Sequence, residues 1–314
     1  MSADTVVEVR NLCKRYGTVQ AVDDVSFEVR SGEVFTLVGP NGAGKTTTLE
    51  CLEGLRVPSS GSVNVLGLDP LKARSRLKAR VGIQLQESAL QPNLKVWEAC
   101  DLFSSFYETA VDWRALLDRL GLADKRNTAF SKLSGGQKQR LYVALALLHD
   151  PELVFLDEIT TGLDPQARHG IWELVLEVKR RGKTVILTTH YMEEAAYLSD
   201  RVAIIDAGRI VALDSPAKLV NDLAAGVKVS FALAGAPDGF SPGDLKSVPG
   251  VVDVTVNENR VSVHGTGESL VAEVVQALAG ANVVFKNLRS EEPTLEDVFF
   301  AKTGRKTQSV EEGR

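Results

Sequence analysis

The sequence predicts an α/β fold in which a large domain with a parallel sheet precedes a smaller α+β domain. Three largely apolar runs, at 34–38, 153–156 and 184–189, each lead directly into a glycine-rich or polar segment. Such runs are typical of parallel strands buried on both faces, whose carboxyl ends carry the ligand sites of open α/β sheets. A length of 314 residues suits one large domain together with a second one.

The composition is that of an ordinary globular protein and does not favour a nucleic-acid partner. Hydrophobic residues make up 44% of the chain and charged residues 25%, and 36 Lys and Arg against 41 Asp and Glu give a formal charge of -5. No nucleic acid is expected, because its binding requires a concentrated basic face. The three cysteines are scattered and lack metal-site spacing, which favours reduced thiols in a cytoplasmic protein.

No stretch of the sequence approaches the roughly eighteen consecutive apolar residues of a membrane span. The first four residues lack the basic and apolar regions of a signal peptide. We therefore expect a cytoplasmic chain that takes any membrane role from a separate subunit.

A β-rich entrance is predicted for residues 5–35. Apolar residues alternate with polar neighbours around positions 7–9 and 25–29, which is the period of half-buried strands. Tyr16 ends the first of these segments, ahead of a glycine-rich loop. By itself, this position is compatible with stacking on a nucleobase or with covering the edge of the sheet.

The glycine-rich loop follows the apolar run 34–38 and precedes a helical segment at 48–55. Its residues are Gly39, Pro40, Asn41, Gly42, Ala43, Gly44, Lys45, Thr46 and Thr47. A strand, a glycine loop and a helix in this order cradle phosphates with backbone N–H groups, and the helix start adds positive potential. The pattern assigns Lys45 to the β- and γ-phosphates and the Thr46 hydroxyl to Mg²⁺. It predicts a nucleoside triphosphate site rather than an ordinary turn.

The middle of the chain changes from strands, at 61–67 and 81–86, to a helical insert at 87–128. The apolar stripe of this insert is expected to be mostly core, although an insert in a sheet domain can also offer a partner surface. Farther on, Ser134 is a good N-cap for the next helix. Two glycines follow this serine, and together they make a second anion site, which suggests service to another copy of the chain.

Two acids and a histidine follow buried strands at the sheet edge where ligands bind. Asp157 and Glu158 come after the run 153–156, and His190 after the run 184–189. Asp157 is predicted to hold Mg²⁺, and Glu158 to polarise the attacking water. Helix capping is the alternative for the acids. The shared sheet edge favours contact of His190 with a γ-phosphate or with water over a structural role.

Taken together, these segments resemble the ATP-binding-cassette (ABC) ATPases over roughly residues 5–220. The phosphate loop is shared by many nucleotide enzymes, whereas the Leu-Ser-Gly-Gly-Gln segment at 133–137 is similar to the family signature and far more specific. The signature residues that the resemblance assigns to the nucleotide are Ser134, Gly135, Gly136 and Gln137.

Further positions carry the same resemblance. Asp164 belongs to a Gly-Leu-Asp segment that is similar to the dimer-contact loop, and His190 is similar to the switch histidine. Gln86 is similar to the glutamine that senses the γ-phosphate and Mg²⁺, with Gln84 two positions earlier as the other register. Tyr16 lies where the family has its adenine-stacking aromatic residue, which favours stacking.

The resemblance implies a head-to-tail dimer with two ATP sites at the interface. The phosphate loop, Glu158 and His190 of one copy would face Ser134 and Gly136 of the other. A helix start supplied by the second copy would complete the charge stabilisation of the γ-phosphate, so closure and hydrolysis would be coupled. The family usually has proline after the catalytic glutamate. Ile159 stands there in this chain, and we expect hydrolysis to survive because both carboxylates remain.

The resemblance places an ABC ATPase domain, with an antiparallel β subdomain, at 1–222. Its helical subdomain spans about 87–150, a small α+β accessory domain follows at 223–304, and 305–314 is a polar tail. The accessory domain is predicted from a strand at 227–231, a loop at 234–249, a hairpin at 252–263, a helix at 270–278, a strand at 283–285 and a final helix from 293. A stabilising or dimer-supporting role is favoured over ligand sensing, because no chemical motif appears there.

The final helix is similar to the ending of exporter-type subunits that serve drug, antibiotic and polysaccharide permeases. The leading hypothesis is therefore an ATPase subunit, peripheral on the inner face of the cell membrane, that energises export of a drug, antibiotic or lipid-linked compound. The insert 87–128 would receive the cytoplasmic helices of a separate membrane permease.

Two other classes of function fit the sequence less well. A soluble ABC-type ATPase in DNA repair or on ribosomes is opposed by the single cassette, the acidic balance and the lack of long coiled-coil segments. A small-molecule kinase would leave the signature at 133–137 and His190 unexplained.

Overall fold

The computed structural model describes residues 5–84, 90–223, 226–235, 240–257, 259–265, 267, 269–291 and 293–304. Contacts divide the described residues into two units, unit 1 up to Pro216 and unit 2 from Ala217 onward. This division falls earlier than the domain boundary expected after residue 222, which stays a prediction. Each unit is described by itself below.

Unit 1 is built on a six-stranded sheet with the order β5-β6-β7-β3-β8-β9. Its first five strands are parallel, and β8 and β9 form an antiparallel pair. The strands are β3 (Val34–Val38), β5 (Val81–Gln84), β6 (Leu153–Asp157), β7 (Thr184–Thr189), β8 (Arg201–Asp206) and β9 (Arg209–Asp214). Every residue of β3, β6 and β7 is buried, which confirms the prediction of parallel strands covered on both faces.

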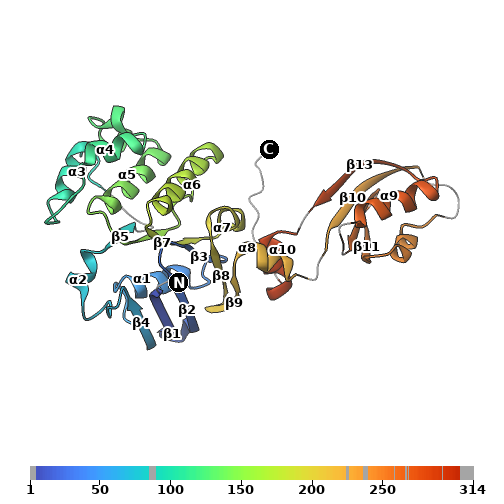
Figure 1. Ribbon diagram of the computed structural model, residues 1–314, viewed down its shortest axis with the longest axis horizontal. Coiled ribbons are helices and arrows are strands. Elements are labelled where there is room, and N and C mark those ends of the chain that lie inside the picture. The colour runs from blue at the N-terminus through green and yellow to red at the C-terminus, as the bar shows by residue number, and fades with distance from the viewer. Residues whose placement is uncertain are drawn as a thin grey trace. The chain divides into compact units, whose positions relative to one another are not determined.

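An antiparallel sheet of β1 (Thr5–Tyr16), β2 (Val19–Arg30) and β4 (Ser60–Val65) forms the predicted β-rich entrance. Its inward residues share a core with one face of the parallel strands, where the rings of Phe27 and Phe35 stack with centroids 5.0 Å apart. The other face is covered by helices of the insert and by the two helices after it. Figure 1 shows α3, α4 and α5 on the opposite side of the six-stranded sheet from β1, β2 and β4.

Seven helices of unit 1 connect these strands, and α8 (Pro216–Asn221) follows at the division between the units. They are α1 (Lys45–Leu52), α2 (Arg74–Lys78), α3 (Val96–Ser104), α4 (Trp113–Arg119), α5 (Gly135–Leu147), α6 (Pro165–Arg180) and α7 (Met192–Leu198). The helix expected at 48–55 begins and ends three residues earlier. The reason is local, because Gly44 caps it in the left-handed conformation and its carbonyl already accepts from the Thr48 N–H.

Unit 2 holds a four-stranded antiparallel sheet with the order β11-β12-β10-β13. Its elements are β10 (Lys228–Gly235), the 3₁₀ turn η3 (Pro242–Ser247), β11 (Val251–Asn257), β12 (Arg260–Gly265), α9 (Leu270–Gly280), β13 (Val284–Glu291) and α10 (Leu295–Thr303). Helix α9 packs one apolar face on the sheet, as its spacing predicted. The expected loop at 234–249 is wrong in part, because it contains η3, and the strand expected at 283–285 continues to Glu291.

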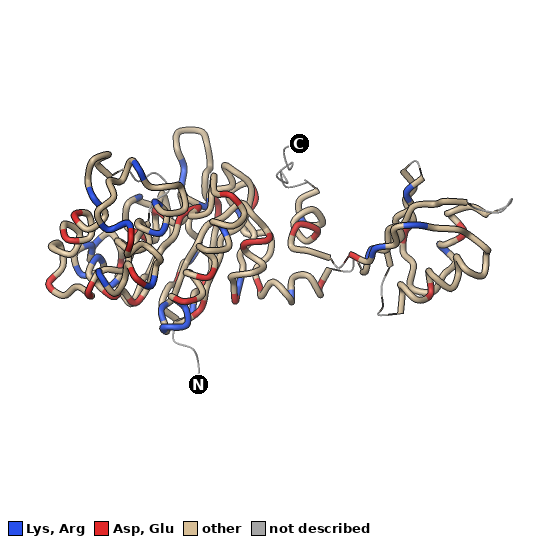
Figure 2. The backbone as a smooth tube through the Cα atoms, turned by 90° about the horizontal axis from the view of Figure 1, so that it is seen from above, with Lys and Arg blue, Asp and Glu red and all other residues tan. Residues whose placement is uncertain are grey.

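Charged residues of both signs are interspersed along unit 1 (Figure 2). Among the described residues, no helix has the length and apolar character needed to cross a membrane.

Candidate functional site

Two glycines let the loop after β3 approach its neighbours closely. A Cβ at Gly39 would lie 2.1 Å from the carbonyl oxygen of Ile205, and one at Gly44 would lie 2.3 Å from that of Ala21. Gly44 also has a φ of 102°, which side chains other than glycine rarely adopt. The loop therefore holds its course between β3 and α1 only with glycine at these positions.

Lys45, the first residue of α1, is 4% exposed and bridges the loop and the sheet. Its Nζ donates to the carbonyl oxygens of Gly39 (2.9 Å) and Pro40 (3.1 Å), and it lies 3.3 Å from Oε1 of Glu158. Burial lowers the pKa of Lys45, and the charge of Glu158 opposes this. The ammonium group thus joins the glycine loop to the end of β6.

Asp157 lies beside Thr46 at the same edge, as the sequence predicted from strand ends. Its Oδ1 accepts from the Thr46 hydroxyl at 3.3 Å and from the Thr188 hydroxyl, while its N–H donates to Oε1 of Gln84 at 3.2 Å. Burial raises the pKa of Asp157, against the two hydroxyl hydrogen bonds. A carboxylate and a hydroxyl oxygen in contact form a donor set that suits Mg²⁺, which usually keeps several waters.

Glu158 is held in a left-handed backbone conformation, with a φ of 46°. Its N–H donates to the Thr188 hydroxyl at 3.1 Å, and its Oε2 accepts from the Thr161 hydroxyl at 3.3 Å. The same Oε2 lies 3.3 Å from Nδ1 of His190, whose proximity, with that of Lys45, lowers the pKa of Glu158 to about 2 although burial opposes this. The structure therefore brings Lys45, Glu158 and His190 together, with the carboxylate ionised at neutral pH.

The signature residues form a separate cluster at the start of α5. Ser134 caps the helix as predicted, because its Oγ accepts from the Gln137 N–H at 3.3 Å and Oε1 of Gln137 accepts from the Ser134 N–H at 3.0 Å. A Cβ at Gly136 would lie 3.1 Å from that of Ala167, so α5 and α6 start side by side. Asp164 caps α6 by accepting from the Ala167 N–H at 2.8 Å. Gln137 and Asp164, predicted to contact nucleotide, thus serve as local caps here.

The predicted residues that remain are Tyr16 and Gln86. Tyr16 is 41% exposed, and the cations of Lys14 and Arg56 lie 5.0 Å and 5.6 Å from the centre of its ring. Gln86 lies outside the described residues. The other register, Gln84, is buried and contacts Asp157 as given above.

Thr188 and Thr161 organise the two carboxylates and were not singled out from the sequence. Thr188 donates to Asp157 and accepts from the Glu158 N–H, whereas Thr161 donates to the Glu158 carboxylate. The position of a hydroxyl residue at the carboxyl end of a buried strand is the feature of the sequence that could have indicated a role for Thr188. The identity of its partners depends on the pairing of β6 with β7.

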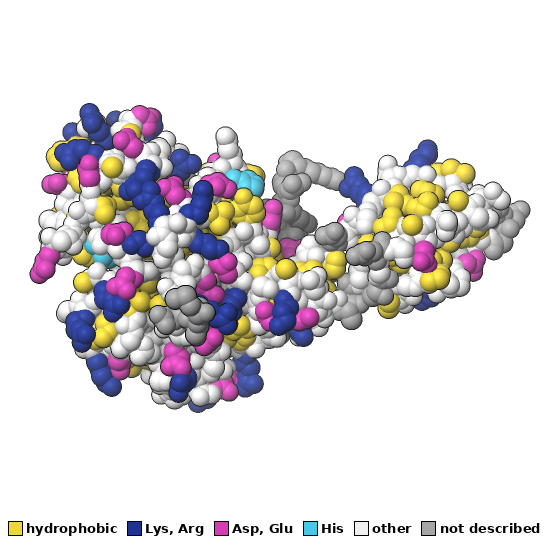
Figure 3. Space-filling view, viewed as in Figure 1, with side chains coloured by type: hydrophobic (Ala, Val, Ile, Leu, Met, Phe, Trp, Pro, Cys, Tyr) yellow, Lys and Arg dark blue, Asp and Glu magenta, His cyan; other side chains and the backbone are white. Residues whose placement is uncertain are grey.

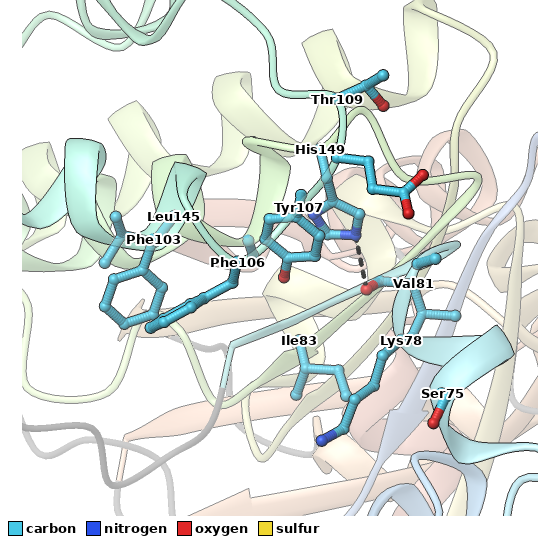
Figure 4. Close-up of a pocket in the computed structure, with 13 residues that line it drawn as sticks. Ser75, Lys78, Val81, Ile83, Phe103, Phe106, Tyr107, Thr109, Leu145 and His149 are labelled. Carbon is cyan, nitrogen blue, oxygen red and sulfur yellow. Dashed lines mark hydrogen bonds between the residues drawn. The ribbon is translucent and has the colours of Figure 1, made fainter.

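A groove with a volume of about 780 Å³ lies between α3 and β5, apart from the loop (Figure 4). Phe103 and Phe106 make an edge-to-face contact on its wall, and Phe106 is 65% exposed. At its far side the ring of Tyr107 stacks on His149 with centroids 4.0 Å apart, and Nε2 of His149 lies 2.9 Å from the carbonyl oxygen of Val81. Aromatic side chains of the insert thus line one wall of the groove, and the contact of His149 with Val81 joins the groove to β5.

Comparisons with known proteins agree with this geometry. The family model described as ABC transporter matches residues 22–161. A linearmycin resistance ATP-binding protein of Bacillus subtilis (strain 168) is 34% identical over 308 residues, covering 96% of this chain and 99% of that protein. A Nod factor export ATP-binding protein I of Rhizobium etli is 36% identical over 312 residues, covering 97% of this chain and 95% of that protein.

One similar solved structure is a dimeric, post-hydrolysis ATP-binding cassette bound to ADP and phosphate. It is 27% identical to this chain, with a TM-score of 0.58, and the match covers 67% of this chain and 98% of that one. This structural match leaves about a third of the chain uncovered, whereas the two sequence relatives cover nearly all of it and therefore extend through unit 2.

Glu53 caps the C-terminus of α1, and its burial predicts an unusual dependence of folding stability on pH. It is 7% exposed, and burial raises its pKa from 4.5 to about 9, with Asp157 and Glu50 adding to the rise. Between these values the unfolded chain is ionised while the folded one holds the proton, so folding stability falls as pH rises. Glu53→Gln has no group to ionise here, so its free energy of unfolding does not fall with pH for this reason. Urea unfolding should show the variant to be more stable than the parent chain at pH 8, with a smaller difference near pH 4.5.

The matched control is Glu177→Gln. Glu177 is paired with Arg181 at 2.9 Å on α6 and is not among the charges that raise the pKa of Glu53, so its replacement removes an interaction and no gain is expected at pH 8. Equal effects of the two variants at both pH values would contradict the buried, protonated state of Glu53.

Proposed function

This chain belongs to the family of ABC transporter ATP-binding proteins, and we propose that it energises export of a drug, antibiotic or lipid-linked compound through a separate membrane permease. The observation that carries the proposal is the extent of the similarity to two relatives named for resistance and export, because it runs through both units. A soluble ATPase of DNA repair or ribosomes is not favoured by these relatives. The proposed location is peripheral, on the inner face of the cell membrane.

The site around the glycine loop supports binding of ATP with Mg²⁺. Backbone N–H groups within residues 41–47 and the start of α1 suit the phosphates, and Lys45 suits the β- and γ-phosphates. Thr46 and Asp157 would hold Mg²⁺, which neutralises phosphate charge when bound. Gln86 is proposed as a further contact to the metal and the γ-phosphate, and Tyr16 as the residue that stacks on adenine.

Glu158 is proposed as the group that orients the attacking water and accepts its proton. With a pKa of about 2 it is a weak base while Lys45 and His190 lie beside it. When the Lys45 side chain turns from Glu158 to a γ-phosphate, Glu158 loses one neighbouring positive charge. Its pKa then rises, and it becomes a stronger base. Water then attacks the γ-phosphorus as its proton passes to Glu158, and ADP leaves. His190 would hydrogen-bond the γ-phosphate.

The separate position of the signature cluster supports a head-to-tail dimer. Ser134, Gly135 and Gly136 lie at the N-terminus of α5, a helix of thirteen residues that suits an anion. The Ser134 hydroxyl and N–H bond to Gln137 in the same turn and, among the described residues, not to the glycine loop. A second copy of the chain would present them to the ATP, with Gln137 and Asp164 beside them. The dimeric cassette with ADP and phosphate is a related protein in which two copies assemble.

The aromatic groove beside α3 supports the docking of permease helices. It is large and partly apolar, and it opens next to the exposed ring of Phe106. It also contacts β5, the strand that leads toward Gln86, so a helix seated there could act on the nucleotide site. We propose 1–222 as the ABC ATPase domain, with the helical subdomain at about 87–150, then 223–304 as the accessory domain and 305–314 as a polar tail.

Glu158→Gln should nearly abolish ATP hydrolysis, by about 10²–10⁴-fold, because the amide cannot accept the proton of water. ATP binding should persist, so the variant should accumulate as an ATP-bound dimer. Turnover assays and size-exclusion chromatography with ATP measure the two effects. Unchanged turnover would remove Glu158 from the proposed role.

Ser134→Arg should block dimer closure and leave ATP binding by the monomer intact, since the change lies outside the glycine loop. Equilibrium binding of ATP and ATP-dependent dimerisation in the Glu158→Gln background separate these outcomes. Ser131→Arg is the matched control, because Ser131 is exposed and lies before the cap. A Ser134→Arg chain that still dimerises with ATP would show that the trans arrangement is wrong.

Phe106→Asp should release the permease without changing basal ATP hydrolysis, because it places a charge in the aromatic groove far from the phosphate loop. Val57→Asp is the matched control, since Val57 is 57% exposed and does not line the groove. Affinity purification from membranes, with identification of the polytopic protein recovered, is the measurement. Equal recovery with both variants would place the permease contact elsewhere.

A further inference from the structure

The sheet of unit 2 has one apolar face and one polar face. Val229 and Phe231 of β10 and Val261 and Val263 of β12 share one core with Leu270, Val274 and Leu278 of α9. Residues that alternate with them along β10, β11 and β12 point to the other side. Figure 1 shows α9 lying along one side of this sheet, and Figure 3 shows that the face of unit 2 on this side carries mainly hydrophobic and uncharged side chains.

The polar face of the sheet contains a hollow with a volume of about 420 Å³. Its lining residues are Lys228, Thr255, Asn257, Arg260, Ser262 and His264. Each of these side chains can donate a hydrogen bond, and two of them carry a permanent positive charge at neutral pH. Within the described part of unit 2, no carboxylate lines the hollow.

Strand pairing brings these donors into a compact array. Lys228 lies opposite His264, Thr255 opposite Ser262, and Asn257 opposite Arg260. Neighbouring strands are about 5 Å apart, and successive residues on one face of a strand are about 7 Å apart. Side chains from three strands can therefore reach one small anion placed over the Ser262 position.

The charge of the surrounding face has the same sign. On β13, Arg289 lies opposite Ser230, and Lys286 lies opposite Ala232, so both extend the polar face. Among the described residues of this face, the carboxylates of Glu291 and Asp253 are paired, with Lys228 at 2.9 Å and with Lys246 at 3.1 Å. Lys228 would therefore contact a bound anion while it also contacts Glu291, whereas no ion pair is found for Arg260 in the described part of unit 2. The chain as a whole has a formal charge of -5, so this face departs from its average.

We propose that this hollow binds the phosphate group of a soluble, phosphorylated small molecule. Charge-assisted hydrogen bonds from Lys228 and Arg260 suit phosphate oxygens, and the hydroxyl and amide groups satisfy the remaining acceptor positions. A membrane surface fits less well, because the described residues that line the hollow include no apolar side chain to enter the acyl boundary. The site goes beyond the export function of the protein and does not depend on it.

The test uses the full-length chain with Lys45→Ala, so that the glycine loop does not compete for phosphate. Glycerol 3-phosphate is titrated at constant ionic strength while the imidazole C–H signals of the four histidines are followed by NMR. Saturable movement of the His264 signals is expected, and glycerol alone should cause none. Arg260→Gln should weaken the apparent affinity at least about tenfold through loss of a charge-assisted pair.

Two further arms complete the experiment. Lys302→Gln, which removes an exposed positive charge on α10 and leaves the hollow intact, should bind like the parent chain, and Lys228→Gln should repeat the loss seen for Arg260→Gln. Equal titrations of the parent chain and Arg260→Gln, or equal movement with sodium chloride, would overturn the proposal. It would also be overturned if anionic phosphatidylglycerol vesicles bound in an Arg260-dependent manner while glycerol 3-phosphate did not.

Discussion

The buried ion pair between Lys45 and Glu158 is the contact on which the candidate site depends. Removing two charges from water is costly, and the cost is offset here because each group has further partners. Loop carbonyls accept from Lys45, while Thr161 and His190 lie against Glu158. Under the proposed function this arrangement would couple two events, since a phosphate that attracted Lys45 would also change the proton affinity of Glu158.

The order of strands explains why these groups meet. β7 lies between β3 and β6, so the glycine loop, the two acids and His190 all leave the sheet at the carboxyl ends of adjacent strands. Thr188 on the middle strand then bonds to both acids. The signature segment at the start of α5 packs against the start of α6, away from the sheet edge that carries the glycine loop and the two acids. A site divided in this way is consistent with the proposed head-to-tail dimer, in which two copies would come together before ATP is hydrolysed.

Unit 2 shows how one sheet can serve two purposes. Its apolar face and α9 form the core of unit 2. The residues that alternate with the apolar ones along the strands do not pack in this core, and several of them are hydrogen-bond donors or cations. The sequence of this region favours a stabilising or dimer-supporting role, because it contains no recognisable chemical motif. The hollow is formed by residues from β10, β11 and β12, so it does not appear as a local pattern.

The sequence by itself determined the buried strands, the glycine loop and the positions of Lys45, Asp157, Glu158 and His190, because each follows from a local pattern at a strand end. It also determined the Ser134 cap, which is a contact between near neighbours. Tertiary structure decided the rest. The bonds of Thr188 and the low pKa of Glu158 arise between segments far apart in the chain, and the polar face of unit 2 depends on strand register. Such contacts are set by which strands pair, and no single segment of sequence specifies that pairing.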